Sequence, residues 1–171
     1  MRYGSEIWTG QEPYYGPDMR RKDRAVKDKK AIGDILESCT VCRIAFNDES
    51  FPYIVPVNYV YVSDCLYFHS ASTGRKLDLI ARDNHVCFEV DREIEVIAAE
   101  HACEWGTRYE SVIGTGTASE VTDPGEKREA LRDFMRKYSG TSEWSFPTEG
   151  LDKTTVVRVD IVSLVGKSSA Q

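Results

Sequence analysis

The sequence lacks any apolar stretch long enough to cross a membrane, and it has no excess of positive charge. The longest apolar run, residues 54–62, is interrupted by Pro56 and Asn58, whereas a membrane-spanning helix needs about 20 apolar residues. The 22 lysines and arginines are outnumbered by 28 aspartates and glutamates, which gives a net charge of −6. A negative protein repels nucleic acid and anionic membrane surfaces. We therefore expect a protein that neither crosses a membrane nor binds nucleic acid.

The features of an exported protein are also missing. Residues 1–10 include Glu6 and contain no apolar block of the kind that an export signal needs. The cysteines are odd in number and have no framework spacing, as is usual for reduced thiols in a cytosolic protein. They are Cys39, Cys42, Cys65, Cys87 and Cys103. We expect a cytoplasmic location.

Common nucleotide and metal motifs are absent as well. No Gly-x-x-x-x-Gly-Lys-Ser/Thr loop occurs, and residues 114–119 lack the last glycine of a dinucleotide fingerprint and lie within a strand pattern. Cys39 and Cys42 have the spacing of a redox or zinc pair, but they follow a helix and enter a strand, whereas a reactive cysteine lies at a helix N-terminus. Adding His101 and Cys103 gives four zinc ligands at an unconvincing spacing. Small buried thiols are the favoured interpretation, and we predict no metal site.

Composition predicts one compact domain after an N-terminal arm. With 41% hydrophobic and 29% charged residues, the chain has the composition of an ordinary globular protein. Residues 1–18 are rich in Tyr, Gly, Pro and Trp and show neither helical nor strand periodicity. We interpret them as an aromatic arm that is loose or packs on a groove or a partner subunit. Residues 19–171 are expected to form a single domain.

The pattern of this domain is mainly β with flanking helices. The expected strands are 41–46, 53–62, 65–69, 85–90, 94–98, 109–121 and 154–165, and the expected helices are 28–38, 74–81 and one that begins at Asp123. In the second helix, Leu77, Ile80 and Ala81 are expected to face inward. Gly114 and Gly116 predict a bulge or a sharp coil in their strand. Short turns between most strands favour a closed or nearly closed antiparallel barrel flanked by helices, an α+β fold.

One segment is typical of an anion site. An apolar strand ends in small and polar residues, and Arg75 and Lys76 follow at the start of a short helix. Backbone N–H groups and the hydroxyls of Ser70, Ser72 and Thr73 converge there, the helix end is partly positive, and an arginine can bind a phosphate bidentately. The alternative is a solvated loop whose cations bind nothing.

This segment resembles the phosphate loop of a known family. The run Tyr67-Phe-His-Ser-Ala-Ser-Thr-Gly-Arg-Lys76 is similar to that of the pyridoxamine 5′-phosphate oxidase-like, FMN-binding split β-barrel proteins, and above all of their nitroimidazole-resistance branch. Further similar elements are Met19-Arg-Arg-Lys-Asp-Arg24, Val41-Cys-Arg-Ile-Ala45, Pro52-Tyr-Ile-Val-Pro-Val-Asn-Tyr59, Leu66-Tyr-Phe-His69 and Ser111-Val-Ile-Gly-Thr-Gly116. The resemblance covers roughly residues 19–165 and implies an antiparallel split β-barrel that binds FMN.

The resemblance also implies which residues contact the cofactor. Arg75 and Lys76 would hold the FMN phosphate together with Ser70 and Ala71, and the backbone of the preceding strand would lie against the isoalloxazine edge. This part of the strand consists of Pro56, Val57, Asn58 and Tyr59. His69 matches a histidine close to the flavin face, where an imidazole can donate to a substrate oxygen or relay a proton. The alternative for His69 is a hydrogen-bonded strand-end histidine without a catalytic part.

A homodimer with the cofactor at its interface follows from the same resemblance. Trp105 and Tyr109 are then candidate aromatic walls from either chain, and Ser111 is a further candidate contact on the same segment. The two aromatic residues can equally be plain barrel packing. Two-fold dimers are also the commonest symmetric oligomers.

The implied activity is that of an FMN-dependent oxidoreductase of the nitroimidazole-resistance type. It would reduce a small electrophile such as a nitroaromatic compound, with electrons from a separate donor or a nicotinamide nucleotide. Two alternatives stay open: a haem-binding split barrel with His69, His85 or His101 as axial ligand, and a flavin-binding module without turnover. Pyridoxamine 5′-phosphate oxidase activity is less favoured, because no second cluster of cations is present for a substrate phosphate.

Overall fold

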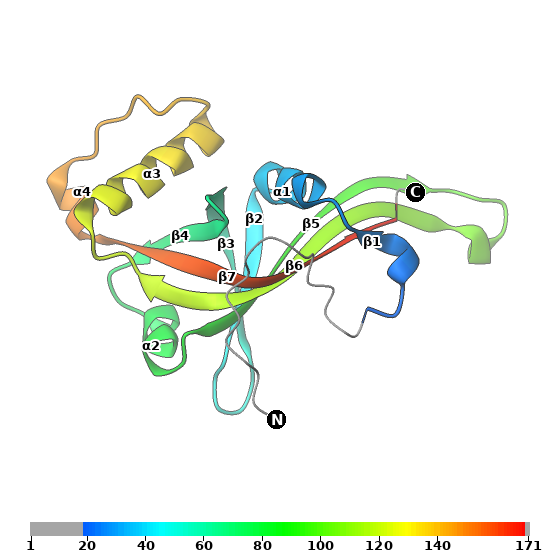
Figure 1. The fold of residues 1–171 in the computed structure, drawn as a ribbon, viewed down its shortest axis with the longest axis horizontal. Helices are drawn as coiled ribbons and strands as arrows, with labels where there is room; N and C mark the ends of the chain where they lie inside the picture. The colour runs from blue at the N-terminus through cyan, green and yellow to red at the C-terminus, as the bar shows by residue number, and fades with distance from the viewer. Residues whose placement is uncertain (1–18, 170–171) are drawn as a thin grey trace.

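The fold is that of a computed structural model, which describes residues 19–169 apart from the side chains of Glu93 and Ile94. The predicted aromatic arm, residues 1–18, lies outside the described residues. The described residues form one barrel of strands with helices packed around it (Figure 1).

Six antiparallel strands close the barrel. They are β2 (Val41–Phe46), β3 (Tyr53–Val62), β4 (Cys65–Ala71), β5 (His85–Ile97), β6 (Gly106–Glu120) and β7 (Thr154–Ser168). The order in the sheet is β1-β7-β4-β3-β2-β5-β6, and β6 pairs back with β7, which closes the barrel. The short strand β1 (Ala25–Val26) pairs with β7 at residues 166–167, beyond the part that pairs with β4. This confirms the predicted antiparallel barrel.

The barrel interior is filled by every second residue of each strand, because side chains alternate between the two faces of a strand. Cys42, Ile44 and Phe46 of β2 are buried in this way. Gly114 and Gly116 of β6 make room for the core. A Cβ added at Gly114 would stand 2.2 Å from the ring of Phe88, and one at Gly116 would stand 2.5 Å from a backbone oxygen of β7. The register of β6 against β7 shifts between Thr115 and Gly116, as the sequence predicts.

Four α-helices cover the barrel. They are α1 (Lys29–Ser38), α2 (Arg75–Arg82), α3 (Pro124–Ser139) and α4 (Thr148–Asp152), and two 3-10 turns, η1 (Lys22–Arg24) and η2 (Ala102–Glu104), accompany them. Asp28 caps α1 and Asp123 caps α3, each by accepting backbone N–H groups of the first turn. In Figure 1, α1 and α3 lie above the barrel and α2 lies below it. No helix of the described chain is long and apolar enough to span a membrane.

The structure corrects the predicted elements in four places. The strands expected at 85–90 and 94–98 are one strand, β5, because a register shift between Glu93 and Glu95 lets it continue along β6. Helix α2 buries Leu79 where Ala81 was expected. Strand β4 continues through Ala71, so Ser70 and Ala71 lie in the ladder with β7 and not in a loop. Helix α4 and strand β1 are not among the predicted elements, because each is too short to show a periodic pattern.

Candidate functional site

The predicted anion site lies where β4 ends and α2 begins. Only residues 72–74 separate the two elements, and Gly74 takes a positive φ of 135° that side chains rarely allow. Space is open around Gly74, since an added Cβ would meet nothing within 4 Å. The turn thus places Arg75 and Lys76 on the first turn of α2, beside the free backbone N–H groups of its N-terminus.

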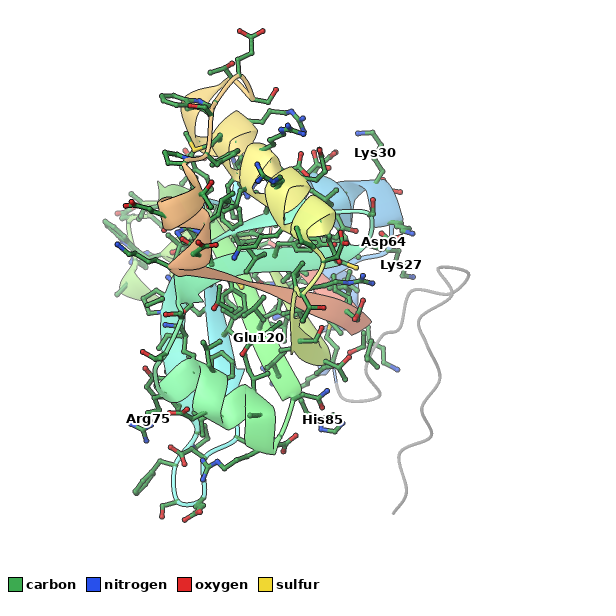
Figure 2. The ribbon with its side chains drawn as sticks, turned by 90° about the vertical axis from the view of Figure 1, so that its left-hand side faces the viewer. Lys27, Lys30, Asp64, Arg75, His85 and Glu120 are labelled. Carbon is green, nitrogen blue, oxygen red and sulfur yellow. The ribbon has the colours of Figure 1, made fainter. Side chains whose placement is uncertain are left out.

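Arg75 is held by the tip of the β2–β3 hairpin. Its Nε and Nη2 donate to Oδ2 of Asp48 at 3.1 and 2.5 Å, and its guanidinium lies 4.5 Å from the centroid of the Tyr53 ring. Arg82, at the other end of α2, donates to Oδ1 of Asp48 at 3.0 Å and pairs with Glu49 at 3.3 Å. Figure 2 shows Arg75 at one end of α2 and His85 at the other. Two arginines of one helix therefore share one carboxylate of the hairpin tip.

The electrostatics of this contact resemble those of a bound anion. The side chain of Asp48 is only 18% exposed, and the hydrogen bonds from Arg75 and Arg82 lower its pKa. The guanidinium of Arg75 is itself 62% exposed, so it remains open to solvent on the side away from Asp48. Arg75 thus already binds a carboxylate of its own chain, in the geometry that the sequence predicts for a phosphate.

His69 lies in the wall of an apolar cavity. On β4 it is one residue away from Ser70, so the two side chains leave opposite faces of the strand. The His69 ring meets the Phe134 ring of α3 edge-on, with 4.9 Å between the centroids. Burial lowers the pKa of His69, so the imidazole is neutral at pH 7. The side chain of His69 is otherwise exposed.

The cavity has a volume of about 280 Å³ and lies between β4, α3 and α4. Apart from His69, its walls are apolar or small: Leu131, Phe134, Met135, Phe146, Pro147, Gly150, Leu151 and Thr154. The hydroxyl of Thr154 donates to the backbone oxygen of Gly150 at 2.8 Å. The imidazole is therefore the polar group of the cavity that has no protein partner among the described residues.

The predicted flavin strand is exposed in its first part and covered in its last. Pro56 and Asn58 are exposed, whereas Tyr59 is fully buried and donates its hydroxyl to the backbone oxygen of Leu36. The backbone N–H of Tyr59 donates to the hydroxyl of Tyr138 at 2.9 Å, which in turn reaches the oxygen of Thr40 at 2.7 Å. Residues 56–58 can therefore receive a ring, while the backbone of Tyr59 is already engaged by α3.

Lys137 is a feature of this end of the barrel that the sequence did not indicate. Its Nζ lies 4.0 Å from the centroid of the Tyr59 ring and is buried without a hydrogen-bond partner among the described residues. Burial lowers its pKa. The helical pattern of α3 predicts a surface position for this lysine. The signal that could have located it is its position directly before Tyr138, which packs on β3.

The candidate metal ligands do not come together. Cys39 and Cys42 are buried free thiols, and burial raises the pKa of Cys42 to about 12. No group of three His, Cys, Asp or Glu residues that could hold a metal ion occurs within residues 19–169. Both cysteines belong to the hydrophobic core, as expected.

Trp105 and Ser111 lie on the other half of the molecule. Trp105 directly follows η2 at the tip of the β5–β6 ribbon and is 56% exposed. Ser111 pairs with Asp91 on β5 and with Lys167 on β7. In Figure 1 the tip of this ribbon lies at the end of the long axis opposite to α2. The ribbon tip with Trp105 therefore lies apart from the junction of β4 and α2 that carries Arg75.

Tyr109 is tied to its own chain. Its hydroxyl accepts a hydrogen bond from Arg24 at 3.5 Å, and Nζ of Lys167 lies 5.5 Å from its ring centroid. Lys167 and Arg24 together lower its pKa. Tyr109 is thus packed between two cations of its own chain.

Comparison with known proteins gives the family. Residues 28–168 match the family described as pyridoxamine 5′-phosphate oxidase. The chain belongs to this family. A candidate 5-nitroimidazole antibiotic resistance protein from Bacteroides thetaiotaomicron has a similar structure at 30% sequence identity, with a TM-score of 0.74 over 84% of this chain and 86% of that one. A search of the curated proteins finds no match.

Two more distant structures share the fold of this oxidase family member. An FAD and haem binding protein from Mycobacterium smegmatis is 19% identical, with a TM-score of 0.76 over 86% of this chain and 74% of that one. An FAD-binding protein from Mesorhizobium loti is 22% identical, with a TM-score of 0.65 over 86% of this chain and 98% of that one.

In this family member, the predicted site residues fall into two groups. The structure brings Arg75, Lys76 and Ser70 together at the junction of β4 and α2, with His69 one residue before Ser70. The residues predicted on β6 lie apart from them. From the sequence, Asp48 and Tyr53 are predicted only as parts of a turn and a strand, whereas in the structure both contact Arg75.

Proposed function

We propose that this protein is an FMN-dependent oxidoreductase that reduces small electrophilic molecules such as nitroaromatic compounds. The observation that carries the proposal is the pair Arg75 and Lys76 on the first turn of α2, directly beyond the strand that presents a neutral His69. Membership of the pyridoxamine 5′-phosphate oxidase family and the likeness to the Bacteroides protein support it.

The residues at the junction of β4 and α2 fit a flavin phosphate. Arg75 has a planar array of donors that already binds a carboxylate, and Lys76 adds a second positive charge beside it. The hydroxyl of Ser70 and the open turn at Gly74 leave room for phosphate oxygens. Residues 56–58 offer an exposed strand for the ring. When bound, the flavin supplies the electron transfer.

At neutral pH His69 has the properties of a hydrogen-bond donor and a proton relay. A neutral imidazole carries one N–H and one free nitrogen, so it can donate to a substrate oxygen and be recharged by solvent. Its ring is partly exposed and is oriented by Phe134 at 4.9 Å. Replacing His69 by Ala should leave FMN bound and slow the reduction of a nitro compound. Equal turnover of variant and parent would remove His69 from the mechanism.

A homodimer with shared sites is part of the proposal. Trp105 lies at the tip of the β5–β6 ribbon, at the end of the molecule opposite to α2, so a partner subunit would supply it and Ser111 to the Arg75 site. The outer face of the sheet offers an apolar surface for this contact. Four residues that lie directly opposite one another in successive strands form a row across this face: Ile54, Ala45, Cys87 and Thr115. Ile54 is 60% exposed.

Haem binding is the second candidate, because one structure with this fold is an FAD and haem binding protein. Two of the three histidines are poorly suited as haem ligands. His85 pairs with Asp83 at 2.7 Å beside the end of α2, and His101 is exposed on the β5–β6 ribbon. Of the three, His69 is the one that lines the cavity between β4, α3 and α4.

Visible absorption spectra of the purified protein test both candidates. Separate samples receive FMN, FAD and haem, and each is desalted before measurement. A two-band flavin spectrum that is retained with FMN supports the proposal, and turnover of a nitro compound with a reduced nicotinamide nucleotide then separates an enzyme from a flavin-binding module. A sharp Soret band with haem and no retained flavin would overturn it.

A further inference from the structure

The hydroxyl of Tyr138 bridges β2 and β3 at the point where their pairing ends. The last pair of this ladder is Val41 and Asn58, so its continuation would place Thr40 opposite Tyr59. The Tyr138 hydroxyl accepts from the backbone N–H of Tyr59 at 2.9 Å. Its own hydrogen is nearest to the backbone oxygen of Thr40, at 2.7 Å, and the oxygen of Tyr59 follows at 3.0 Å. A side chain of α3 thus completes the hydrogen bonding where the two strands separate.

The environment of this hydroxyl makes it the natural acceptor for the strand end. Tyr59 is fully buried, so its N–H is shielded from water and depends on an acceptor within the protein. Burial raises the pKa of Tyr138, whereas its interactions with the backbone of Tyr59 and the side chain of Asn58 lower it. The hydroxyl therefore stays protonated at neutral pH and interacts with both residues at the end of the strand.

The ring of Tyr138 is itself held in place on α3. Phe134 lies one helical turn before it, and the two rings stack with 6.1 Å between centroids and 15° between their planes. Phe134 is buried and meets the ring of His69 edge-on. One face of α3 therefore contacts β3 at Tyr59 and β4 at His69.

The side chain of Tyr59 is anchored separately from its backbone. Its hydroxyl donates to the backbone oxygen of Leu36, and Nζ of Lys137 lies 4.0 Å from the centroid of its ring. These contacts fix the side chain, and Tyr138 fixes the backbone of the same residue.

We propose that Tyr138 is a positioning residue for the flavin: its hydroxyl fixes residues 58–59, the end of the strand that receives the isoalloxazine ring. The inference rests on the proposed function, in which this strand contacts the ring. A strand end that is already fixed loses no further conformational freedom on binding, so the ring binds more tightly than it would to a mobile strand. Tyr138 acts through the strand and not by touching the flavin.

Tyr138→Phe tests the proposal, because it removes the hydroxyl and keeps the stacked ring. FMN and riboflavin carry the same ring, so both should bind roughly three- to tenfold more weakly in a fluorescence titration. Ser139→Ala is the matched control, since it removes the neighbouring hydroxyl and should bind both ligands as the parent does. The partners of that hydroxyl in the described chain lie outside β3: Met135, Thr141 and Trp144.

Two readouts separate positioning from a plain loss of stability, both taken where circular dichroism shows every variant to be folded. In flavin-free protein, the amide hydrogen of Tyr59 should exchange about tenfold faster or more in Tyr138→Phe than in Ser139→Ala, because the N–H has lost its acceptor. With FMN bound, the long-wavelength flavin absorption band of Tyr138→Phe should be shifted from that of the parent. A purely structural hydroxyl would lower the melting temperature and leave the affinity and the flavin spectrum unchanged. That result, or unchanged exchange of the Tyr59 amide, would overturn the proposal.

The parent protein separates this proposal from the proposed function. If the parent binds neither FMN nor riboflavin, the proposed oxidoreductase fails, and a role of Tyr138 in positioning a flavin fails with it. If the parent and Tyr138→Phe bind FMN equally well, the flavin site stands and only the role of Tyr138 fails.

Discussion

The guanidinium of Arg75 is the most specific contact that the proposed flavin site offers. A hydrogen bond to a charged group contributes about 1.5–3 kcal/mol, so Arg75→Ala should weaken FMN binding by roughly ten- to a hundredfold. Riboflavin, which has no phosphate, should lose little. Arg82→Ala is the control, because Arg82 binds the same Asp48 from the far end of α2. A fluorescence titration that gives equal FMN affinities for Arg75→Ala and the parent would contradict the phosphate assignment.

His69 should also make stability depend on pH. Burial lowers the pKa of the folded-state imidazole below its usual value, so the unfolded chain binds the proton more tightly. Stability from this group is therefore present at pH 7 and above and is lost as the pH falls through the unfolded value of about 6.5.

Replacing His69 by Gln removes this titration and keeps a polar side chain of similar size. We expect the parent to lose more of its unfolding free energy between pH 7.5 and pH 5.5 than His69→Gln does, as measured by urea denaturation. The carboxylates titrate in both proteins and cancel in the comparison. Parallel losses would show that the imidazole is fully hydrated in the folded protein.

At the scale of elements, the tip of the β2–β3 hairpin and α2 act as one unit. Asp48 links them by accepting from both Arg75 and Arg82, and its carboxylate occupies donors that a phosphate needs. Asp48→Asn removes the competing charge. Since a partly exposed ion pair contributes about 0.2–1 kcal/mol, FMN affinity should rise by roughly 1.4- to fivefold.

Riboflavin is the control for this prediction as well, because its affinity does not depend on a phosphate contact. The same rise for riboflavin would indicate a change in the hairpin itself and not in the competition for Arg75. Weaker FMN binding in Asp48→Asn would mean that the carboxylate orients the guanidinium for the ligand.

The elements of this fold could be predicted from the sequence wherever a local signal exists. Asp123 and Pro124 mark the start of α3 through cap chemistry, and the alternation in 41–46 marks β2. The Asp48–Arg75 contact could not be predicted, because it joins residues 27 positions apart through a fold that local patterns do not specify. The cavity at His69 could not be predicted either, because one of its walls includes α4, which has too few residues for a periodic signal.

For the whole molecule, the distance between the two halves of the predicted site argues for a dimer. The exposed face with Ile54 would be buried between subunits, and an ionised carboxylate there would lose its hydration without a partner. Ile54→Glu should therefore sediment as a monomer where the parent sediments as a dimer. Phe51→Glu, at the hairpin tip and 81% exposed, is the control and should remain dimeric. A monomeric parent that binds FMN would show that one chain completes the site.

Mixing two variants that each weaken FMN binding tests whether the sites are shared. Arg75→Ala lacks the phosphate contact, and Trp105→Ala lacks the aromatic wall that a partner would supply. In a mixed dimer, the site at the intact Arg75 faces the intact Trp105 of the other subunit, whereas the second site lacks both. Mixed dimers formed by refolding the two chains together should therefore regain one FMN site of parental affinity each, which neither variant shows alone. If Trp105 served its own chain, every site in the mixture would lack one residue and no binding would return. The tip of the β5–β6 ribbon, where Trp105 follows η2, lies at the end of the long axis opposite to α2, which favours the first outcome.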